Sequence, residues 1–437
     1  MKPTFFLSLS TRMSIRRATN IRNRNWLVST ISRRKFRALS PSFLLLSFFA
    51  FFLFPVFFKN TRTRKTDERE NNRLLKCAIV TTTANASGKQ FEQWFRWHHQ
   101  ILGFEMFYVF VDDRGTPSSF SARSQSLVPE NVKLFRESHG DLESIRPKLR
   151  CNKEQWLVPW MRKRGCNAEL FVKQSQNVEM AISMARKDNI DWIAHIDTDE
   201  LLFPSGGASL DIRELLQDQP GYVDAIVFPN YEAVPEMRGG VQDPFVDATL
   251  FKRNYEQARD KDKWKKLGGE VVRNKSLPNF FLAYANGKSI ARIAGNKLRS
   301  NGAHRFKFRS ASSSPPSREL NFNEVTHEEA KLLHYPYMNL NESIKRLRKC
   351  SRDATSSFHA ELDFLLEFDR RAYVALVLNN EGSVSSPQQQ SSRRRREDWY
   401  NRRVVFEDKN EVAKLVRGDV FQRIYAPSLL LKNLSPA

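Results

Sequence analysis

Short apolar runs alternate with amphipathic segments through the first half of the chain, and this alternation constrains the fold more than any other feature. The apolar runs 74–83 and 104–111 flank residues 89–102, where apolar side chains recur every three or four positions. The runs predict buried strands, and the segment between them predicts a helix that ends before Gly103. A strand, a helix and a second strand in this order predict a parallel βαβ unit.

The same alternation continues as far as residue 228. It predicts strands at 132–135, 191–196 and 223–228 and helices at 168–186 and 211–217. We therefore expect an α/β fold whose open, mostly parallel sheet is flanked by helices. In such sheets, ligands bind beyond the carboxyl ends of the strands.

The domain organisation follows from changes in composition. The α/β domain is expected at 74–380, with a helical stretch at 341–368. Residues 381–398 contain Ser, Gln and Arg runs and predict a low-complexity linker. Residues 399–437 form a C-terminal tail.

The N-terminal residues carry a strong charge bias. The chain has 437 residues, with 71 Lys+Arg against 48 Asp+Glu and a formal net charge of +23. Residues 1–37 hold ten basic and no acidic residues, and 38–58 holds no charge at all. As a helix, those uncharged residues span about 31 Å, enough for a bilayer core. We expect a cytosolic tail at 1–37, a transmembrane anchor at 38–58 and a stem at 59–73, in a single-pass type II membrane protein.

Two alternatives stay open at this point. A basic, Ser-rich, acid-poor N-terminus is also typical of an organelle transit peptide, and the net charge then fits a nucleic-acid-binding protein. The chain contains no zinc module or RNA-recognition signature, and much of the charge lies in the flanks, so we expect no nucleic-acid partner.

The state of two cysteines is also open at this point. Cys151 and Cys166 form either a disulfide or two buried thiols.

Asp197 and Asp199 directly follow the predicted strand 191–196. Two carboxylates two residues apart on a turn can approach one divalent cation, which takes oxygen ligands and leaves positions open for a diphosphate. An isolated Asp-x-Asp also fits a solvated turn that caps a helix. The preceding buried strand favours the metal site.

Together these motifs resemble the nucleotide-sugar transferases of the GT-A type. The resemblance runs from about Cys77 to Leu347 and rests on the first helix with Trp94, Trp97-His98 and Gly103, and on the segments FYVFVDD, KQSQNVEMAISMAR and DWIAHIDTDELLFP. It is strongest to glycosyltransferase family 92 and the related family 2-like group. The resemblance implies a membrane-anchored, metal-dependent glycosyltransferase of the Golgi, with its catalytic domain in the lumen.

The resemblance also implies roles for individual residues. Asp199 would ligate Mn²⁺ or Mg²⁺ directly, and Asp197 would bind the metal through water or hold the donor ribose. A later histidine completes such a site, for which His304 and His334 are the candidates. The residues expected to face the nucleotide are Thr81, Thr82, Thr83, Asp112 and Asp113. Helix capping and turn formation are the alternative for the two aspartates.

An inverting transfer needs a carboxylate that takes the proton of the attacking hydroxyl. Glu232 lies nearest the carboxyl end of the predicted strand 223–228, so we predict it as the base, with Asp243 or Asp247 as the next candidates. The resemblance to the family favours a UDP-sugar as the donor, with UDP-galactose as the first candidate, and a glycan or polysaccharide as the acceptor. A catalytically inactive glycan-binding relative is a further alternative, which the presence of both Asp197 and Asp199 disfavours.

Overall fold

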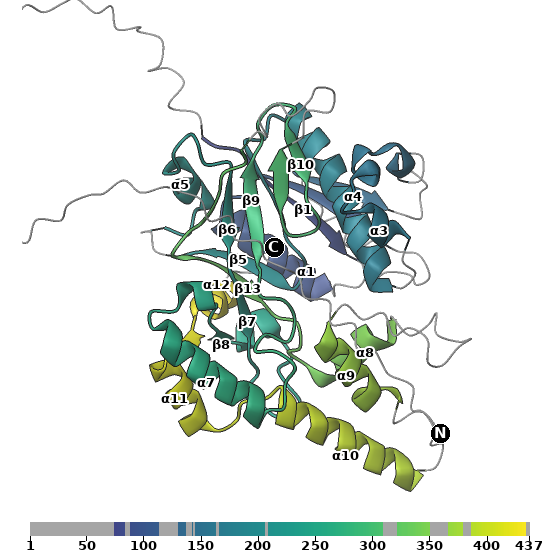
Figure 1. The fold of residues 1–437 in the computed structure, drawn as a ribbon, viewed down its shortest axis with the longest axis vertical. Helices are drawn as coiled ribbons and strands as arrows, with labels where there is room; N and C mark the ends of the chain where they lie inside the picture. Colours follow the sequence, from purple (N-terminus) through teal and green to yellow (C-terminus); the bar gives the residue numbers. More distant parts are fainter. Residues whose placement is uncertain are drawn as a thin grey trace, which may run out of the picture. The chain divides into compact units, whose positions relative to one another are not determined.

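The computed structural model describes residues 74–83, 88–112, 130–136, 142, 145–162, 166–205, 209–308, 321–349, 366–378 and 386–433 (Figure 1). They belong to one compact unit that spans Glu70–Ala437. The predicted tail, anchor and stem at 1–73 lie outside the described residues. Within those residues, no helix is both long and apolar enough to cross a bilayer.

A seven-stranded mixed sheet has the order β12-β6-β9-β4-β1-β2-β3. All neighbouring strands are parallel except that β9 runs antiparallel to β4 and β6. The strands are β1 (Cys77–Thr83), β2 (Met106–Val111), β3 (Val132–Arg136), β4 (Trp192–His195), β6 (Ala225–Phe228), β9 (Lys288–Arg292) and β12 (Glu324–Thr326). The expected α/β fold with a parallel-rich sheet is confirmed.

Helices cover both faces of this sheet. Successive side chains of a strand point to opposite faces, so strands that are apolar throughout give the sheet two apolar faces to bury. Ile79 of β1 packs in a buried cluster with Trp94 and Trp97, whereas Val80 packs in another with Ala181. The covering helices are α1 (Gly88–Arg96), η1 (Trp97–Ile101), α4 (Cys166–Lys187) and α5 (Ile212–Gln217). A sheet buried on both sides needs strands that are apolar throughout, which explains the continuous apolar runs.

Shorter elements complete this part of the chain. They are the helices η3 (Arg146–Lys148), η4 (Arg150–Lys153) and α3 (Val158–Met161) and the antiparallel pair β10 (Leu298–Ser300) and β11 (Phe306–Phe308). Cys151 is a free, buried thiol in this region. Among the described residues, Cys151 is therefore not part of a disulfide.

A five-stranded sheet has the order β14-β8-β7-β13-β5 and extends downward in Figure 1 from β5 and β13 to β7 and β8. Its strands are β5 (Glu200–Pro204), β7 (Asn230–Ala233), β8 (Leu250–Lys252), β13 (Ala330–His334) and β14 (Phe421–Arg423). The remaining helices of the described residues are α6 (Pro244–Asp247), η5 (Tyr255–Gln257), α7 (Lys261–Asn274), α8 (Leu340–Lys349), α9 (Glu367–Leu376), α10 (Ser386–Arg403), α11 (Lys409–Arg417) and α12 (Ala426–Asn433).

The C-terminal region differs from the prediction. The segment 381–398, expected to be a linker, forms α10 from Ser386 onwards, and the buried Ser392 and Tyr400 lie on one side of that helix. The segment 399–437 is more than a tail, because Phe421 is buried in the same cluster as Leu267 and β14 pairs with β8. The domain thus continues past residue 380 at least to Asn433. Polar composition misled the prediction, since only one side of α10 is buried.

The predicted helix 89–102 is an α-helix that continues as the π-helix η1. His98 is buried in η1, where its Nδ1 contacts Trp94 O at 2.8 Å and its Nε2 accepts a hydrogen bond from Leu202 N at 3.2 Å. These contacts require a neutral ring that carries its proton on Nδ1. Burial outweighs the Trp94 hydrogen bond and lowers the pKa of His98 to about 3. The hydrogen bond from Leu202 N to the neutral ring thereby connects η1 to β5.

Acid is expected to destabilise the chain through His98. Its folded-state pKa of about 3 lies below the ordinary 6.5, so the unfolded state binds the proton first and stability falls as the pH drops below 6.5. Between pH 7 and pH 5 this term lowers the free energy of unfolding by about 2 kcal/mol. Urea denaturation of wild type and His98→Gln at both pH values measures it, with His99→Gln as the control. An equal pH dependence in wild type and His98→Gln would contradict the assignment.

Candidate functional site

The acidic turn, residues 197–200, connects β4 to β5 at the carboxyl end of β4. Asp197 N donates to Glu200 Oε2 at 2.8 Å, and Glu200 N donates to Asp197 O at 3.1 Å. Because β4 is parallel to β1, with His195 opposite Val80, the turn lies beside the carboxyl end of β1. This is the edge at which open α/β sheets bind their ligands.

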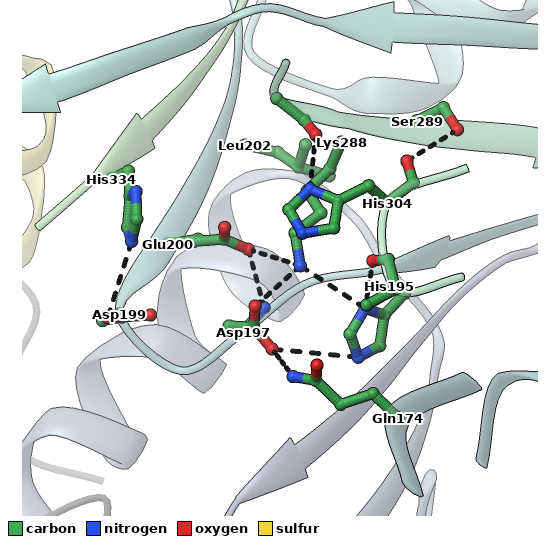
Figure 2. A network of polar contacts seen from close by, with 12 residues as sticks. Gln174, His195, Asp197, Asp199, Glu200, Leu202, Lys288, Ser289, His304 and His334 are labelled. Atoms are coloured by element: carbon green, nitrogen blue, oxygen red, sulfur yellow. Dashed lines mark hydrogen bonds and ion pairs between the residues drawn. The ribbon is translucent and has the colours of Figure 1, made fainter. Parts of the chain in front are cut away.

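Asp197 is held from three sides (Figure 2). Lys288 Nζ donates to Asp197 Oδ2 at 2.7 Å, and Gln174 Nε2 donates to Asp197 Oδ1 at 2.7 Å. His195 Nε2 lies 3.8 Å from the same Oδ1. The contacts come from β9, α4 and β4, so Asp197 joins three separate elements.

Lys288 is a fully buried cation within this network. Its Nζ also lies 3.4 Å from Glu200 Oε2, and both side chains have 0% exposure. Burial acts to lower the pKa of Lys288, but the charges of Asp197 and Glu200 outweigh it and raise the pKa. Burial acts in turn to raise the pKa of Asp197, and the Lys288 charge outweighs it and holds that pKa low. Asp197 and Lys288 therefore form an ion pair in which Lys288 is fully buried and Asp197 is 23% exposed.

Asp199 is the open carboxylate of the turn. Its side chain is 32% exposed, and its Oδ2 lies 3.6 Å from Nε2 of the buried His334 at the end of β13. Burial acts to raise the pKa of Asp199, but the hydrogen bond and charge of His334 outweigh it and lower the pKa. Tyr335 N donates to Asp199 O at 2.9 Å, which holds the main chain of the turn.

Both candidate histidines contact the Tyr284 ring. The rings of Tyr284 and His334 stack at 4.8 Å, and those of Tyr284 and His304 meet edge-on at 4.4 Å. His304 Nδ1 contacts Gly287 O at 3.0 Å. Burial lowers the pKa of His304 to about 3, so the ring is neutral. The structure thus brings both histidines to the acidic turn, with only His334 in contact with a turn carboxylate.

Helix α1 connects the turn to Asp243. Gln90 Nε2 donates to Thr198 O at 2.9 Å, and Gln93, one turn further along α1, donates to Asp243 Oδ2 at 2.9 Å. Lys89 Nζ lies 2.8 Å from the same Oδ2. Asp243 Oδ1 is buried and has no hydrogen-bond partner among the residues that the structure describes. Asp243 therefore has one carboxylate oxygen without a partner among the described residues, and α1 contacts both this residue and the turn.

Thr81, Thr82 and Thr83 form the carboxyl end of β1 and lie on the same edge as the acidic turn. All three are buried. Thr82 Oγ1 accepts a hydrogen bond from Asn177 of α4 at 2.9 Å, and Thr81 Oγ1 is buried with no partner among the described residues.

Asp112 follows β2 on this edge and is tied to α4. Its Oδ2 accepts a hydrogen bond from Lys173 Nζ at 2.7 Å, and its N donates to Thr83 O at 2.8 Å. Asp112 therefore forms an ion pair with Lys173. This structural contact differs from the helix capping that was the alternative for this residue. Asp113 lies outside the described residues.

Glu232, the predicted base, is engaged elsewhere. Its carboxylate is 1% exposed on β7 and forms an ion pair with Lys252 Nζ at 2.6 Å. The same carboxylate accepts hydrogen bonds from Leu282 N at 2.8 Å and Ala283 N at 2.9 Å. These contacts occupy both oxygens in the interior of the five-stranded sheet. This engagement argues against the prediction that Glu232 is the base, because neither oxygen is free to take a proton.

A cavity of about 560 Å³ lies along the C-terminal half of α4. Its lining includes Phe110, Met180, Arg186 and Arg299 and none of the predicted site residues. The cavity is therefore distinct from the acidic turn.

The parallel-rich sheet and the acidic turn define a class of α/β proteins that bind ligands beyond the carboxyl ends of their strands. Two curated relatives, both glycosyltransferase-like proteins of Arabidopsis thaliana, narrow this class. The first is 36% identical over 382 residues, which cover 87% of this chain and 77% of the relative. The second is 35% identical over 365 residues, which cover 83% of this chain and 65% of the relative, just under two thirds of its length. The chain belongs to this family of glycosyltransferase-like proteins and is a glycosyltransferase.

The similarity of this chain to solved structures is weaker than its similarity to these two relatives. S. aureus TarS is 11% identical, with a TM-score of 0.27 over 72% of this chain and 44% of that structure. Mouse xyloside xylosyltransferase 1 in its apo form is also 11% identical, with a TM-score of 0.23 over 50% of this chain and 66% of that structure. Scores this low support no argument about the fold. No protein-family model matches the chain.

Proposed function

We propose that this chain is a metal-dependent glycosyltransferase of the GT-A type, similar to family 92. It transfers a sugar from a nucleotide-sugar donor to a glycan with inversion. The first candidate for the donor is UDP-galactose, which would supply galactose. One observation carries the proposal: Asp199 and His334 face each other at 3.6 Å, on the sheet edge where a ligand is expected. The family membership supplies the reaction class, and this pair supplies a place for the donor diphosphate.

The residues fit a cation held by few protein ligands. Among the described residues, no three His, Cys, Asp or Glu side chains are grouped to hold a metal ion. Asp197 is engaged by Lys288 and Gln174, which leaves Asp199 and His334. Magnesium-type cations commonly take one or two carboxylates and complete their shell with substrate phosphates and water. Asp199 and His334 would hold Mn²⁺ or Mg²⁺, which when bound neutralises charge on the leaving diphosphate.

Asp243 is the base that we propose in place of Glu232. Its Oδ2 is fixed by Gln93 and Lys89 of α1, and its Oδ1 is left to accept a proton. Because α1 also holds the turn through Gln90, the base and the metal-binding residues are positioned by one helix. A positioned carboxylate near the attacking hydroxyl contributes about 10²–10⁴-fold to such reactions.

Release of UDP from a panel of UDP-sugars tests the proposal. The detergent-solubilised full chain is expected to release UDP from at least one donor with Mn²⁺, and EDTA is expected to stop release. Asp243→Asn should slow sugar transfer to acceptor or water by about 100-fold or more while the Kd for UDP stays unchanged. Asp247→Asn, at the end of the short helix α6 that Asp243 precedes, is the matched control and should stay near wild type. Absence of release from every donor contradicts the function, and a fully active Asp243→Asn contradicts the base.

We also propose that residues 38–58 anchor the enzyme in the Golgi membrane, with the domain in the lumen. The proposal is supported by the ten basic residues of 1–37 and the absence of charge in 38–58. A fluorescent fusion of the full chain should co-localise with a Golgi marker. Labelling of plastids or mitochondria would instead support a transit peptide.

A further inference from the structure

Arg346 lies on α8, a short distance along the chain from His334. Its side chain is 40% exposed, and its Nη2 lies 3.5 Å from Asp369 Oδ2. The guanidinium also lies over the ring of Tyr337, 5.2 Å from the centroid, and Tyr337 OH donates to Asp369 Oδ1 at 2.8 Å. A ring and a carboxylate thus hold an exposed guanidinium in one place.

The charge of Arg346 acts on the acidic turn. Burial acts to lower the pKa of Arg346, but the charges of Asp369, Asp199 and Asp197 outweigh it and raise the pKa. Main-chain geometry also places the guanidinium near the turn, because Tyr335 N donates to Asp199 O at 2.9 Å and the guanidinium lies over Tyr337, two residues further along the chain.

A donor diphosphate needs a cation at this place. It would bring its negative charge to a turn that already holds Asp197, Asp199 and Glu200. The Lys288 ammonium cannot meet a ligand there, because it is fully buried and engaged by Asp197 and Glu200. Arg346 differs because it is exposed, and a guanidinium matches the geometry of phosphate oxygens with paired N–H donors.

We propose that Arg346 binds the diphosphate of the nucleotide-sugar donor and so determines that the site accepts a diphosphate. This inference rests on the proposed function, because it assigns one contact of that donor. Arg346 binds the leaving group from the exposed side of the turn, opposite the buried Lys288. Asp369 and Tyr337 position the guanidinium before the donor arrives.

Calorimetric titration of the full chain with UDP and with uridine, in the presence of Mn²⁺, tests the inference. Arg346→Ala should weaken UDP binding by about tenfold or more and leave uridine binding unchanged, because uridine lacks the phosphates. Arg346→Lys should retain part of the UDP affinity, since an ammonium keeps the charge without the paired donors. Lys345→Ala, an exposed neighbour on α8 whose side chain pairs with Glu342, is the matched control and should bind UDP like wild type.

The outcomes separate the two proposals. Wild-type affinity for UDP in Arg346→Ala overturns the inference and leaves the proposed function standing. Equal weakening of UDP and uridine in both Arg346 variants also overturns it, because that result indicates a structural role. A change confined to the KM of the glycan acceptor overturns it in favour of an anionic acceptor. If wild type binds no UDP at all, the proposed function fails and the inference fails with it.

Discussion

Replacement of Asp199 by asparagine is expected to abolish sugar transfer while the protein stays folded. Asp199 is the open carboxylate of the acidic turn and faces His334 at 3.6 Å. An amide keeps the shape but loses the charge that would hold a cation against the diphosphate. We expect kcat/KM for the donor to fall by about 10³-fold or more, which corresponds to about 4 kcal/mol of transition-state stabilisation. Initial rates of UDP release measure the loss.

Asp197→Asn is the informative comparison for this prediction. Its partner Lys288 is fully buried, so the variant leaves a buried ammonium with Glu200 as its remaining carboxylate. Loss of one partner of a buried pair costs about 3–5 kcal/mol of the free energy of unfolding. Denaturant unfolding should therefore separate an unstable Asp197→Asn from an Asp199→Asn close to wild type. An Asp199→Asn enzyme that keeps more than a tenth of wild-type activity would contradict the metal-binding role.

Removal of either partner of the Glu232–Lys252 pair is expected to cost more stability than any surface change. Both side chains are almost completely buried, and Nζ lies 2.6 Å from Oε1. Lys252→Met leaves a buried carboxylate, and Glu232→Gln leaves a buried ammonium, so each should lower the free energy of unfolding by about 3–5 kcal/mol. The double variant should recover part of this loss, because neither charge remains. Urea denaturation of the three variants measures the coupling.

The pair of Glu236 with Arg423 provides the control. These side chains also join through a short ion pair, at 2.5 Å, but both are about one third exposed. Glu236→Gln should therefore cost about 1 kcal/mol or less. A Glu232→Gln variant with wild-type stability and no transfer would restore Glu232 as the base and displace Asp243.

The acidic turn was predictable because its signal is local. A buried strand followed at once by Asp197 and Asp199 occupies a few adjacent residues, and parallel strands align their carboxyl ends. The alternation of strands and helices up to residue 228 was predictable for the same reason. Strands of the five-stranded sheet were mostly missed, because several are only three to five residues long and pair with distant segments.

The partners of the acidic residues could not be predicted in this way. Lys288 follows Asp197 by 91 positions and Lys252 follows Glu232 by 20, and nothing in either local sequence separates a buried lysine from a solvated one. Arg346 lies in the amphipathic helix α8, where an arginine is usually exposed and without function. Each assignment needed the tertiary contacts, which decide whether a charge is paired, buried or left open to a ligand.

Strand β14 has a consequence for how the protein is made. β8 lies between β7 and β14, so its second edge remains unpaired until residues 421–423 arrive. A ribosome synthesises the chain from its N-terminus, and those residues leave the exit tunnel after all the other strands of both sheets. The seven-stranded sheet and the acidic turn can form earlier during translation, whereas the five-stranded sheet closes only after residues 421–423 have been synthesised. A premature stop codon shortly before β14 would therefore leave an exposed strand edge, which is a template for aggregation.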